Sequence, residues 1–196
     1  MKSVCVFSGS KSGTSPRYAE AARALGREIA SRKLRLVYGG GNVGLMGEVA
    51  STVAAAGGEV VGVIPERLKP REVSGETSWE EIVVKDMHER KATMEKLSDG
   101  FISLPGGFGT LEETFEIIAW QQLGYHKKPI GLLNVDGFYD GLSRFVDHAT
   151  SEGFIRDEYR NIMLTADDPA KLLDTMASYD APTDVVTRIT SGRFDV

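Results

Sequence analysis

The chain has 196 residues, of which 41% are apolar, enough to fill the core of one domain of ordinary size. Its 23 Lys and Arg residues against 28 Asp and Glu residues give a net charge of −5 without a basic block, which argues against a general nucleic-acid binder. The single cysteine, Cys5, excludes a disulfide framework within the chain and is expected to be a small core residue.

The first predicted strand, Val4–Phe7, is a continuous apolar run typical of a parallel strand covered on both faces. It is far shorter than the apolar region of a signal peptide or a spanning helix, so we expect a soluble, cytoplasmic protein without a membrane partner. A small polar loop, 8–14, follows this strand. A helix is then predicted from about Pro16 to Ser31, with proline in its first turn.

The same unit recurs as a strand, Leu34–Tyr38, a glycine loop, Gly39–Gly44, and a helix, Leu45–Ala56. The loop contains the Gly-x-Gly-x-x-Gly pattern of a dinucleotide fold, but a lone copy is a weak signal. Neither Glu59 nor Glu66 cleanly fits the acidic position expected about twenty residues further on. A dinucleotide oxidoreductase is therefore an alternative, which failure to bind NAD or NADP in calorimetry would dismiss.

A third strand, Glu59–Ile64, is followed by a loop over 65–75 and a weaker strand, Ile82–Val84. Asp86 is suited to cap a helix from Met87 to about Leu97. Near the start of that helix, Arg90 and Lys91 can flank one pocket. Taken alone, such a charged run is most often a solvated helix surface.

The central unit joins a buried strand, Gly100–Leu104, to an apolar helical run, Thr114–Leu123, through a glycine turn. The N–H groups of such a turn, together with the first turn of the helix and its positive dipole end, favour an anion such as phosphate. Thr110 adds a hydroxyl, and Glu113 is close enough to face a sugar whose phosphate lies on the turn. A sharp loop without any ligand is the alternative for a generic glycine turn.

The later predicted elements are a strand over Pro129–Asn134, a helix over Phe138–Ser151 and a last helix from Asp168-Pro169 to about Ser178. The remaining tail, Asp180–Val196, is expected to pack on the surface or on a partner subunit. The alternation predicts an α/β, three-layer Rossmann-like fold: a mostly parallel sheet with helices on both faces, built as one domain over residues 1–196. Right-handed crossovers place every loop that follows a strand on one edge, where ligands bind.

The sequence contains no motif typical of a metal site or of a serine hydrolase. The histidines, His88, His126 and His148, are widely spaced, and neither Cys-x-x-Cys nor His-Glu-x-x-His occurs. A Gly-x-Ser-x-Gly elbow is also lacking. We therefore expect neither a metal nor a cofactor, and we interpret His88 as structural.

Three motifs in the same order resemble those of the Lonely Guy family, the cytokinin riboside 5′-monophosphate phosphoribohydrolases. The most specific is Pro-Gly-Gly-x-Gly-Thr-x-x-Glu over residues 105–113. The others are Met-His-x-Arg-Lys over 87–91 and the glycine loop with its continuation over 38–47. Lys69 to Glu72 also resembles the Pro-Arg-Glu segment of that family, although a solvent-facing loop charge is an equal alternative for Glu72.

The resemblance implies hydrolysis of the N-glycosidic bond of N6-substituted adenosine 5′-monophosphates, or of AMP, to free base and ribose 5-phosphate. Glu113 would stabilise positive charge on the ribose or position water, and Arg90 would act as a fixed positive charge. These two residues are the predicted catalytic residues. The predicted substrate-binding residues are Glu72, Arg90, Lys91, Gly106, Gly107, Phe108, Gly109, Thr110 and Glu113.

The central helix carries more apolar surface than one core face needs, at Phe115, Ile117, Ile118 and Trp120. Burial against the sheet is one explanation, and a homodimer interface next to the active site is what the resemblance implies. A non-catalytic nucleotide or molybdenum-cofactor carrier of the same fold is the main alternative function. Lysine decarboxylase, a name often attached to such sequences, would need pyridoxal phosphate on a buried lysine, and no lysine here has that context.

Overall fold

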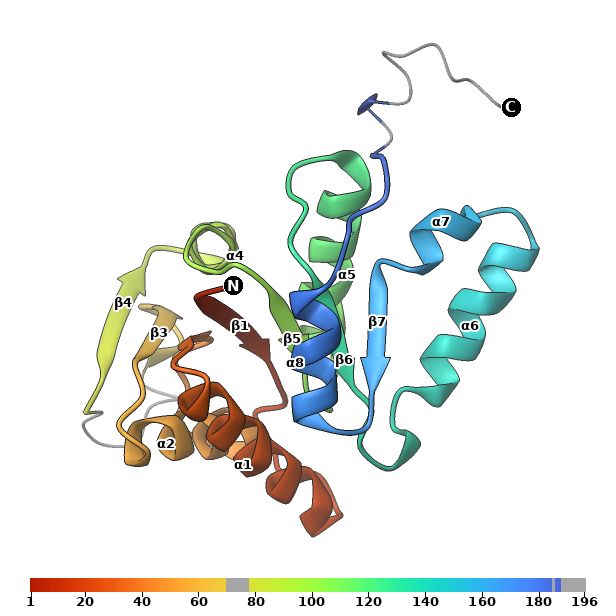
Figure 1. Ribbon diagram of the computed structural model, residues 1–196. Helices are drawn as coiled ribbons and strands as arrows, with labels where there is room; N and C mark the ends of the chain where they lie inside the picture. The colour runs from red at the N-terminus through yellow and green to blue at the C-terminus, as the bar shows by residue number, and fades with distance from the viewer. Residues whose placement is uncertain (70–77, 185, 188–196) are drawn as a thin grey trace.

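The computed structural model describes residues 1–69, 78–184, 186 and 187. Its centre is a seven-stranded sheet in the order β4-β3-β2-β1-β5-β6-β7, with every neighbouring pair parallel (Figure 1). The strands are β1 (Ser3–Phe7), β2 (Arg35–Tyr38), β3 (Val60–Pro65), β4 (Glu80–Val84), β5 (Phe101–Ser103), β6 (Ile130–Leu133) and β7 (Met163–Ala166). The predicted α/β class and Rossmann-like layering are confirmed, and the sheet is parallel throughout the described residues.

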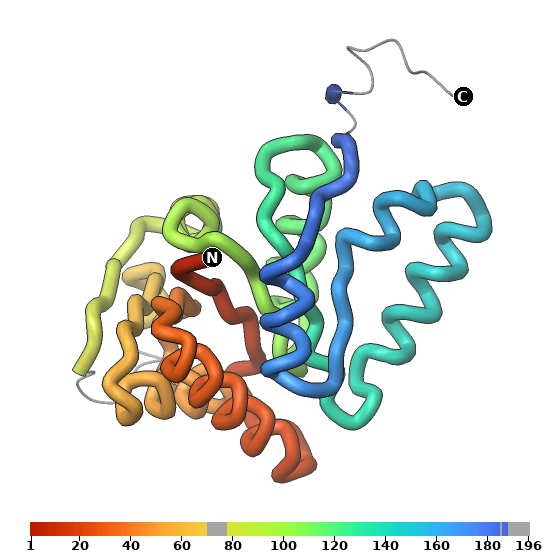
Figure 2. The backbone as a smooth tube through the Cα atoms, viewed as in Figure 1, coloured from red at the N-terminus to blue at the C-terminus, as the bar shows by residue number. Residues whose placement is uncertain are grey.

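Helices cover both faces of the sheet. One face is covered by α1 (Pro16–Ser31), α2 (Gly44–Ala55) and α8 (Pro169–Ala177), whose apolar side chains form one core with β1, β2 and β6. The other face is covered by α4 (Met87–Lys96), α5 (Phe108–Leu123), α6 (Asp140–Ser151) and the short α7 (Asp157–Arg160). Figure 2 shows α1 and α8 side by side although they lie far apart in the sequence, and an ion pair of 2.7 Å between Arg32 and Asp174 joins them.

Local sequence accounts for the starts of α1 and α4. Ser15 caps α1, accepting a hydrogen bond from the Arg17 N–H, and Pro16 occupies the first turn. The Asp86 carboxylate caps α4 as expected, accepting from the N–H groups of His88 and Glu89. Cys5 is fully buried, as expected, and burial raises the pKa of its thiol.

Two predicted features differ in the structure. The helix expected from Phe138 begins at Asp140, because residues 135–137 form a 3-10 turn that the Asn134 side chain stabilises. The Asn134 amide oxygen accepts from the Tyr139 N–H at 2.7 Å, and its amide nitrogen donates to Asp140 at 2.7 Å. The segment 157–166, for which we predict no element, forms α7 and the edge strand β7.

The described part of the expected tail packs on its own chain, since the Tyr159 hydroxyl donates to the carbonyl of Thr183 at 3.2 Å. Residues 185 and 188–196 of that tail lie outside the described residues. A search of the described residues for a helix long and apolar enough to cross a membrane finds none.

Candidate active site

The N-terminus of α5 lies at the carboxyl edge of the sheet, directly after β5 and its glycine turn. Gly107 is the N-cap residue, so no side chain caps the helix. The first N–H groups of an α-helix have no acceptor within the helix, and the helix dipole adds positive potential there. The turn predicted to bind an anion therefore presents an uncapped helix start.

Open space surrounds two glycines of this turn. A Cβ atom built on Gly107 or on Gly109 would meet no other atom within 4 Å, so packing within the protein does not require glycine at either position. Gly106 differs, because a Cβ there would lie 2.1 Å from the Thr110 hydroxyl oxygen. Gly106 thus lets the Thr110 side chain close over the turn, while Gly107 and Gly109 leave backbone exposed to a ligand.

Arg90 lies on the first turns of α4 and is only 7% exposed. Its Nη2 donates to the carbonyl of Gly39 at the end of β2 at 3.0 Å, and its Nη1 contacts the sulfur of Met87 at 3.8 Å. The same Nη1 lies 4.0 Å from Oε1 of Glu113. The guanidinium is therefore fixed at the sheet edge, facing the second turn of α5.

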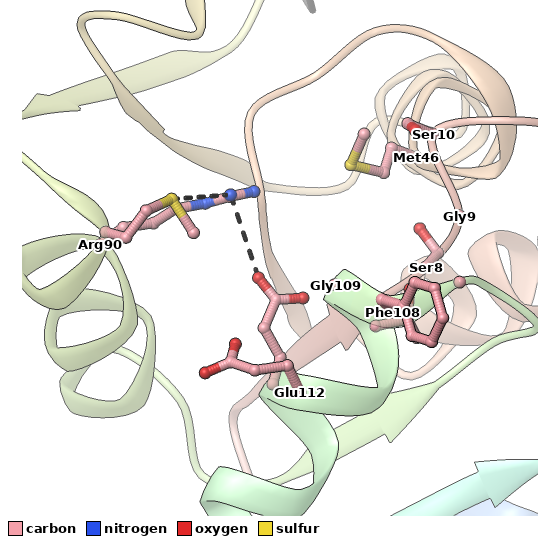
Figure 3. A pocket seen from close by; sticks show the side chains of 12 residues that line it. Ser8, Gly9, Ser10, Met46, Arg90, Phe108, Gly109 and Glu112 are labelled. Atoms are coloured by element: carbon pink, nitrogen blue, oxygen red, sulfur yellow. Dashed lines mark hydrogen bonds and ion pairs between the residues drawn. The ribbon is translucent and has the colours of Figure 1, made fainter.

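The Arg90–Glu113 pair forms part of the lining of a cavity of about 260 Å³ (Figure 3). Both side chains are largely buried, 8% exposed for Arg90 and 12% for Glu113. The start of α5 forms another part of the lining, and Ser8, Gly9 and Ser10 after β1, Met46 of α2 and Met87 of α4 also contribute. Of the predicted site residues, the cavity brings together Arg90, Gly107, Phe108, Gly109, Thr110 and Glu113.

Lys91 does not line this cavity. Its ammonium binds the carboxylates of Glu112 at 2.7 Å and Glu116 at 2.8 Å, which ties α4 to α5. Burial of the ammonium alone lowers the pKa of Lys91, but the hydrogen bonds to Glu112 and Glu116 outweigh this effect and hold the pKa above its usual value. Substrate binding by Lys91 stays a prediction, and the observed contacts are those of a clamp between two helices.

The glycine loop after β2 has a local explanation. A Cβ on Gly39 would lie 2.0 Å from Nη2 of Arg90, so glycine makes room for the guanidinium. Gly40 and Gly44 have φ values of +79° and +56°, which favour glycine. The Gly-x-Gly-x-x-Gly pattern thus places Arg90 and the start of α2 at the cavity.

Six residues of the cavity lining were not among the predicted site residues: Ser8, Gly9, Ser10, Met46, Met87 and Glu112. Ser8 directly follows β1, so the rule that ligands bind beyond the carboxyl ends of strands could have found it. Glu72, together with Pro70 and Arg71, lies outside the described residues. Within the described ranges, no three His, Cys, Asp or Glu side chains gather as metal ligands would.

Comparisons with known proteins give consistent matches. A family model described as "Possible lysine decarboxylase" matches residues 46–176. The chain is 52% identical over 186 residues to cytokinin riboside 5′-monophosphate phosphoribohydrolase LOG7 of Arabidopsis thaliana, covering 95% of this chain and 86% of that protein. It is 54% identical over 176 residues to the probable phosphoribohydrolase LOGL2 of Oryza sativa subsp. japonica, covering 90% and 72%. Among solved structures, the molybdenum cofactor binding protein of Rippkaea orientalis matches with a TM-score of 0.68 and 26% identity, over 91% of this chain and 97% of that one.

Proposed function

The chain belongs to the Lonely Guy family of cytokinin riboside 5′-monophosphate phosphoribohydrolases, and from this premise we propose that Glu113 and Arg90 carry its reaction. The activity is hydrolysis of the N-glycosidic bond, in which water adds to the anomeric carbon and the base departs, leaving ribose 5-phosphate. Departure of the base builds positive charge on the ribose, as in glycoside hydrolysis. The convergence of a buried carboxylate and a buried guanidinium on one cavity supports this assignment most directly.

In the proposed mechanism the substrate phosphate lies on the uncapped start of α5, against the N–H groups of Phe108, Gly109 and Thr110. Glu113, one turn further along the same helix, then faces the sugar. Its negative charge stabilises the positive charge that develops at the anomeric carbon. Arg90 carries several N–H donors on a planar guanidinium and so orients Glu113 and the sugar.

The test is turnover of isopentenyladenosine 5′-monophosphate, followed by chromatography of the free base. We expect Glu113→Gln and Arg90→Ala each to reduce kcat about a hundredfold or more, because each removes a preorganised group facing the developing charge. Glu89→Gln is the matched control: it makes the same charge change beside Arg90, but the Glu89 carboxylate accepts from the Lys85 N–H at 2.7 Å. Near-normal turnover in a folded Glu113 or Arg90 variant would remove that residue from the mechanism.

The phosphate seat is tested with the same enzyme and the unphosphorylated riboside. A ligand without phosphate cannot use the charge-assisted hydrogen bonds of the helix start, so we expect kcat/KM to fall by at least two orders of magnitude. Equal kcat/KM values for riboside and nucleotide would refute the seat while leaving the catalytic pair in place.

We also propose a homodimer formed through the outward face of α5 and α6. Phe115 of α5 is 38% exposed and Phe145 of α6 is 64% exposed. A groove of about 160 Å³ beside them is lined by Phe115, Ile118, Val146 and other side chains. A second copy that covers this face would bury apolar surface next to the helix that carries Glu113. Sedimentation should give a dimer that Phe145→Glu dissociates, and a monomeric parent protein at micromolar concentration would contradict the proposal.

A further inference from the structure

Two polar atoms of the cavity lining have no hydrogen-bond partner among the described residues: the hydroxyl oxygen of Ser8 and Nε of Arg90. Both atoms are buried, and the two residues are only 9% and 7% exposed. A buried polar group without a partner lowers stability, so most such groups in folded proteins are paired. Figure 3 shows Ser8 across the cavity from Arg90.

The backbone on either side of Ser8 is held firmly. The carbonyl of Phe7 accepts from the Leu104 N–H at 2.9 Å. The N–H of Gly9 donates to Pro105 at 3.1 Å, and its carbonyl accepts from Leu45 at 3.0 Å. Ser8 is therefore positioned by β5 and by the start of α2, as a preorganised binding residue would be.

We propose that Ser8 is a substrate-contacting residue whose hydroxyl hydrogen-bonds a ribose hydroxyl of the nucleotide, opposite Arg90 and Glu113. This inference rests on the proposed function, which seats the sugar between the phosphate turn and Glu113. A neutral hydroxyl that both donates and accepts suits another hydroxyl. The phosphate, in contrast, has its own donors at the start of α5.

The sugar can also supply an acceptor for Nε of Arg90, the second atom without a described partner. Nη2 of Arg90 donates to the carbonyl of Gly39, and Nη1 contacts Met87 and lies 4.0 Å from Glu113, whereas Nε is buried without a hydrogen-bond partner among the described residues. Sugar oxygens can accept from Nε while a ribose hydroxyl pairs with Ser8. One ribose would then give a hydrogen-bond partner to both the Ser8 hydroxyl and Nε of Arg90.

The experiment compares isopentenyladenosine 5′-monophosphate with its 2′-deoxy and 3′-deoxy forms on the parent enzyme and on Ser8→Ala. We expect Ser8→Ala to lower kcat/KM for the ribonucleotide roughly tenfold, the value of one hydrogen bond. For the analogue that lacks the contacted hydroxyl, kcat/KM should not change. Intrinsic reactivity differences between the sugars cancel, because the same substrates are compared on both proteins. The analogue whose kcat/KM is unchanged by Ser8→Ala identifies the contacted hydroxyl as the 2′ or the 3′ group.

The melting temperature of the free enzyme distinguishes a substrate-binding role of Ser8 from a purely structural one. Ser8→Ala removes a buried hydroxyl without a described partner, so the melting temperature should stay the same or rise. Ser98→Ala is the matched control: Ser98 is 2% exposed and its hydroxyl donates to the carbonyl of Met94 at 2.8 Å. That variant should melt earlier and keep the parent preference for ribose.

The proposal is overturned if Ser8→Ala discriminates between the three sugars as the parent does. It is also overturned if the loss is equal for all three nucleotides and absent for the unphosphorylated riboside, because that pattern places Ser8 at the phosphate. Failure of the proposed function looks different: Glu113→Gln would then retain turnover, whatever Ser8→Ala does.

Discussion

At the scale of single residues, the position of Arg90 depends on Gly39 having no side chain. The guanidinium occupies the space that a Cβ would take, 2.0 Å from Nη2, and the Gly39 carbonyl accepts its hydrogen bond. Gly39→Ala should therefore fold, since the displaced atoms are the end of a flexible side chain, but it should move Arg90 away from Glu113. We expect kcat to fall about a hundredfold, as a shift of about 1 Å in a catalytic group can cause.

Steady-state kinetics and a melting curve of Gly39→Ala check this expectation. Gly141→Ala in α6 is the control, because a Cβ there meets only one atom, at 3.9 Å. Alanine inside that helix should stabilise the protein by about 0.5–1 kcal/mol and leave kcat unchanged. If Gly39→Ala kept full turnover, the placement of Arg90 by the glycine loop would be wrong.

At the scale of elements, the strands of the inner sheet could be predicted because each is a short, mostly apolar run bounded by glycine, proline or polar residues. The edge strand β7 escaped prediction: it has four residues, and only Met163 and Ala166 at its ends are buried. Length and periodicity carry little signal in so short a segment. The start of α5 at Phe108 was clear only from the glycine turn, since its apolar run begins later.

The candidate site divides in the same way. The glycine turn and Glu113 could be argued from local chemistry, since an uncapped helix start and a carboxylate one turn later lie within one segment. The different contacts of Arg90 and Lys91 could not be derived from the local sequence, because their partners lie on other parts of the chain, after β2 and on α5. Ser8 could not be singled out from the sequence either, because it stands out only by its buried hydroxyl, which has no described hydrogen-bond partner in the folded chain.

The clamp between α4 and α5 makes a prediction at this scale. Lys91, with a side chain only 12% exposed, holds Glu112 and Glu116 of α5, and its helix neighbour Arg90 faces Glu113. Lys91→Met should lower the free energy of unfolding by about 1 kcal/mol and lower kcat about tenfold by loosening the Arg90–Glu113 geometry. Denaturant titration and kinetics would show this, with Lys96→Met, an exposed lysine on the same helix, as the control. A normal kcat in Lys91→Met would mean that the clamp does not position Arg90 and Glu113, the proposed catalytic pair.

At the scale of the whole molecule, strand order decides where the site can form. The chain leaves β1 towards β2 on one side and returns on its other side at β5, so the crevice at this switch point lies between Ser8 and the start of α5. Segments around residues 8, 39, 90 and 113 meet there although long stretches of chain separate them. A site assembled across the sheet in this way depends on cooperative folding of both halves.

His126 links that cooperative stability to pH. It is 7% exposed in the loop between α5 and β6; its Nε2 donates to the Ile117 carbonyl at 3.0 Å, and its Nδ1 accepts from the Lys128 N–H at 3.2 Å. Burial lowers the pKa of His126 and the nearby Lys128 ammonium adds to this, although the Ile117 bond and the Glu95 carboxylate act in the opposite direction. The folded protein therefore holds a neutral ring at a pH where the unfolded chain already binds a proton.

The contribution of His126 to the free energy of unfolding should be constant above the pKa of about 6.5 of an unfolded-chain histidine. It should fall as the pH drops from there towards the lower pKa of His126 in the folded protein. The slope for one proton is at most about 1.4 kcal/mol per pH unit. Urea titrations of the parent and of His126→Gln between pH 7.5 and 5.5 measure it, and the variant should lose the slope. His148→Gln, which removes an exposed histidine of α6, should keep it. Equal slopes in the parent and His126→Gln would show that the ring is protonated in the folded protein as readily as in the unfolded chain.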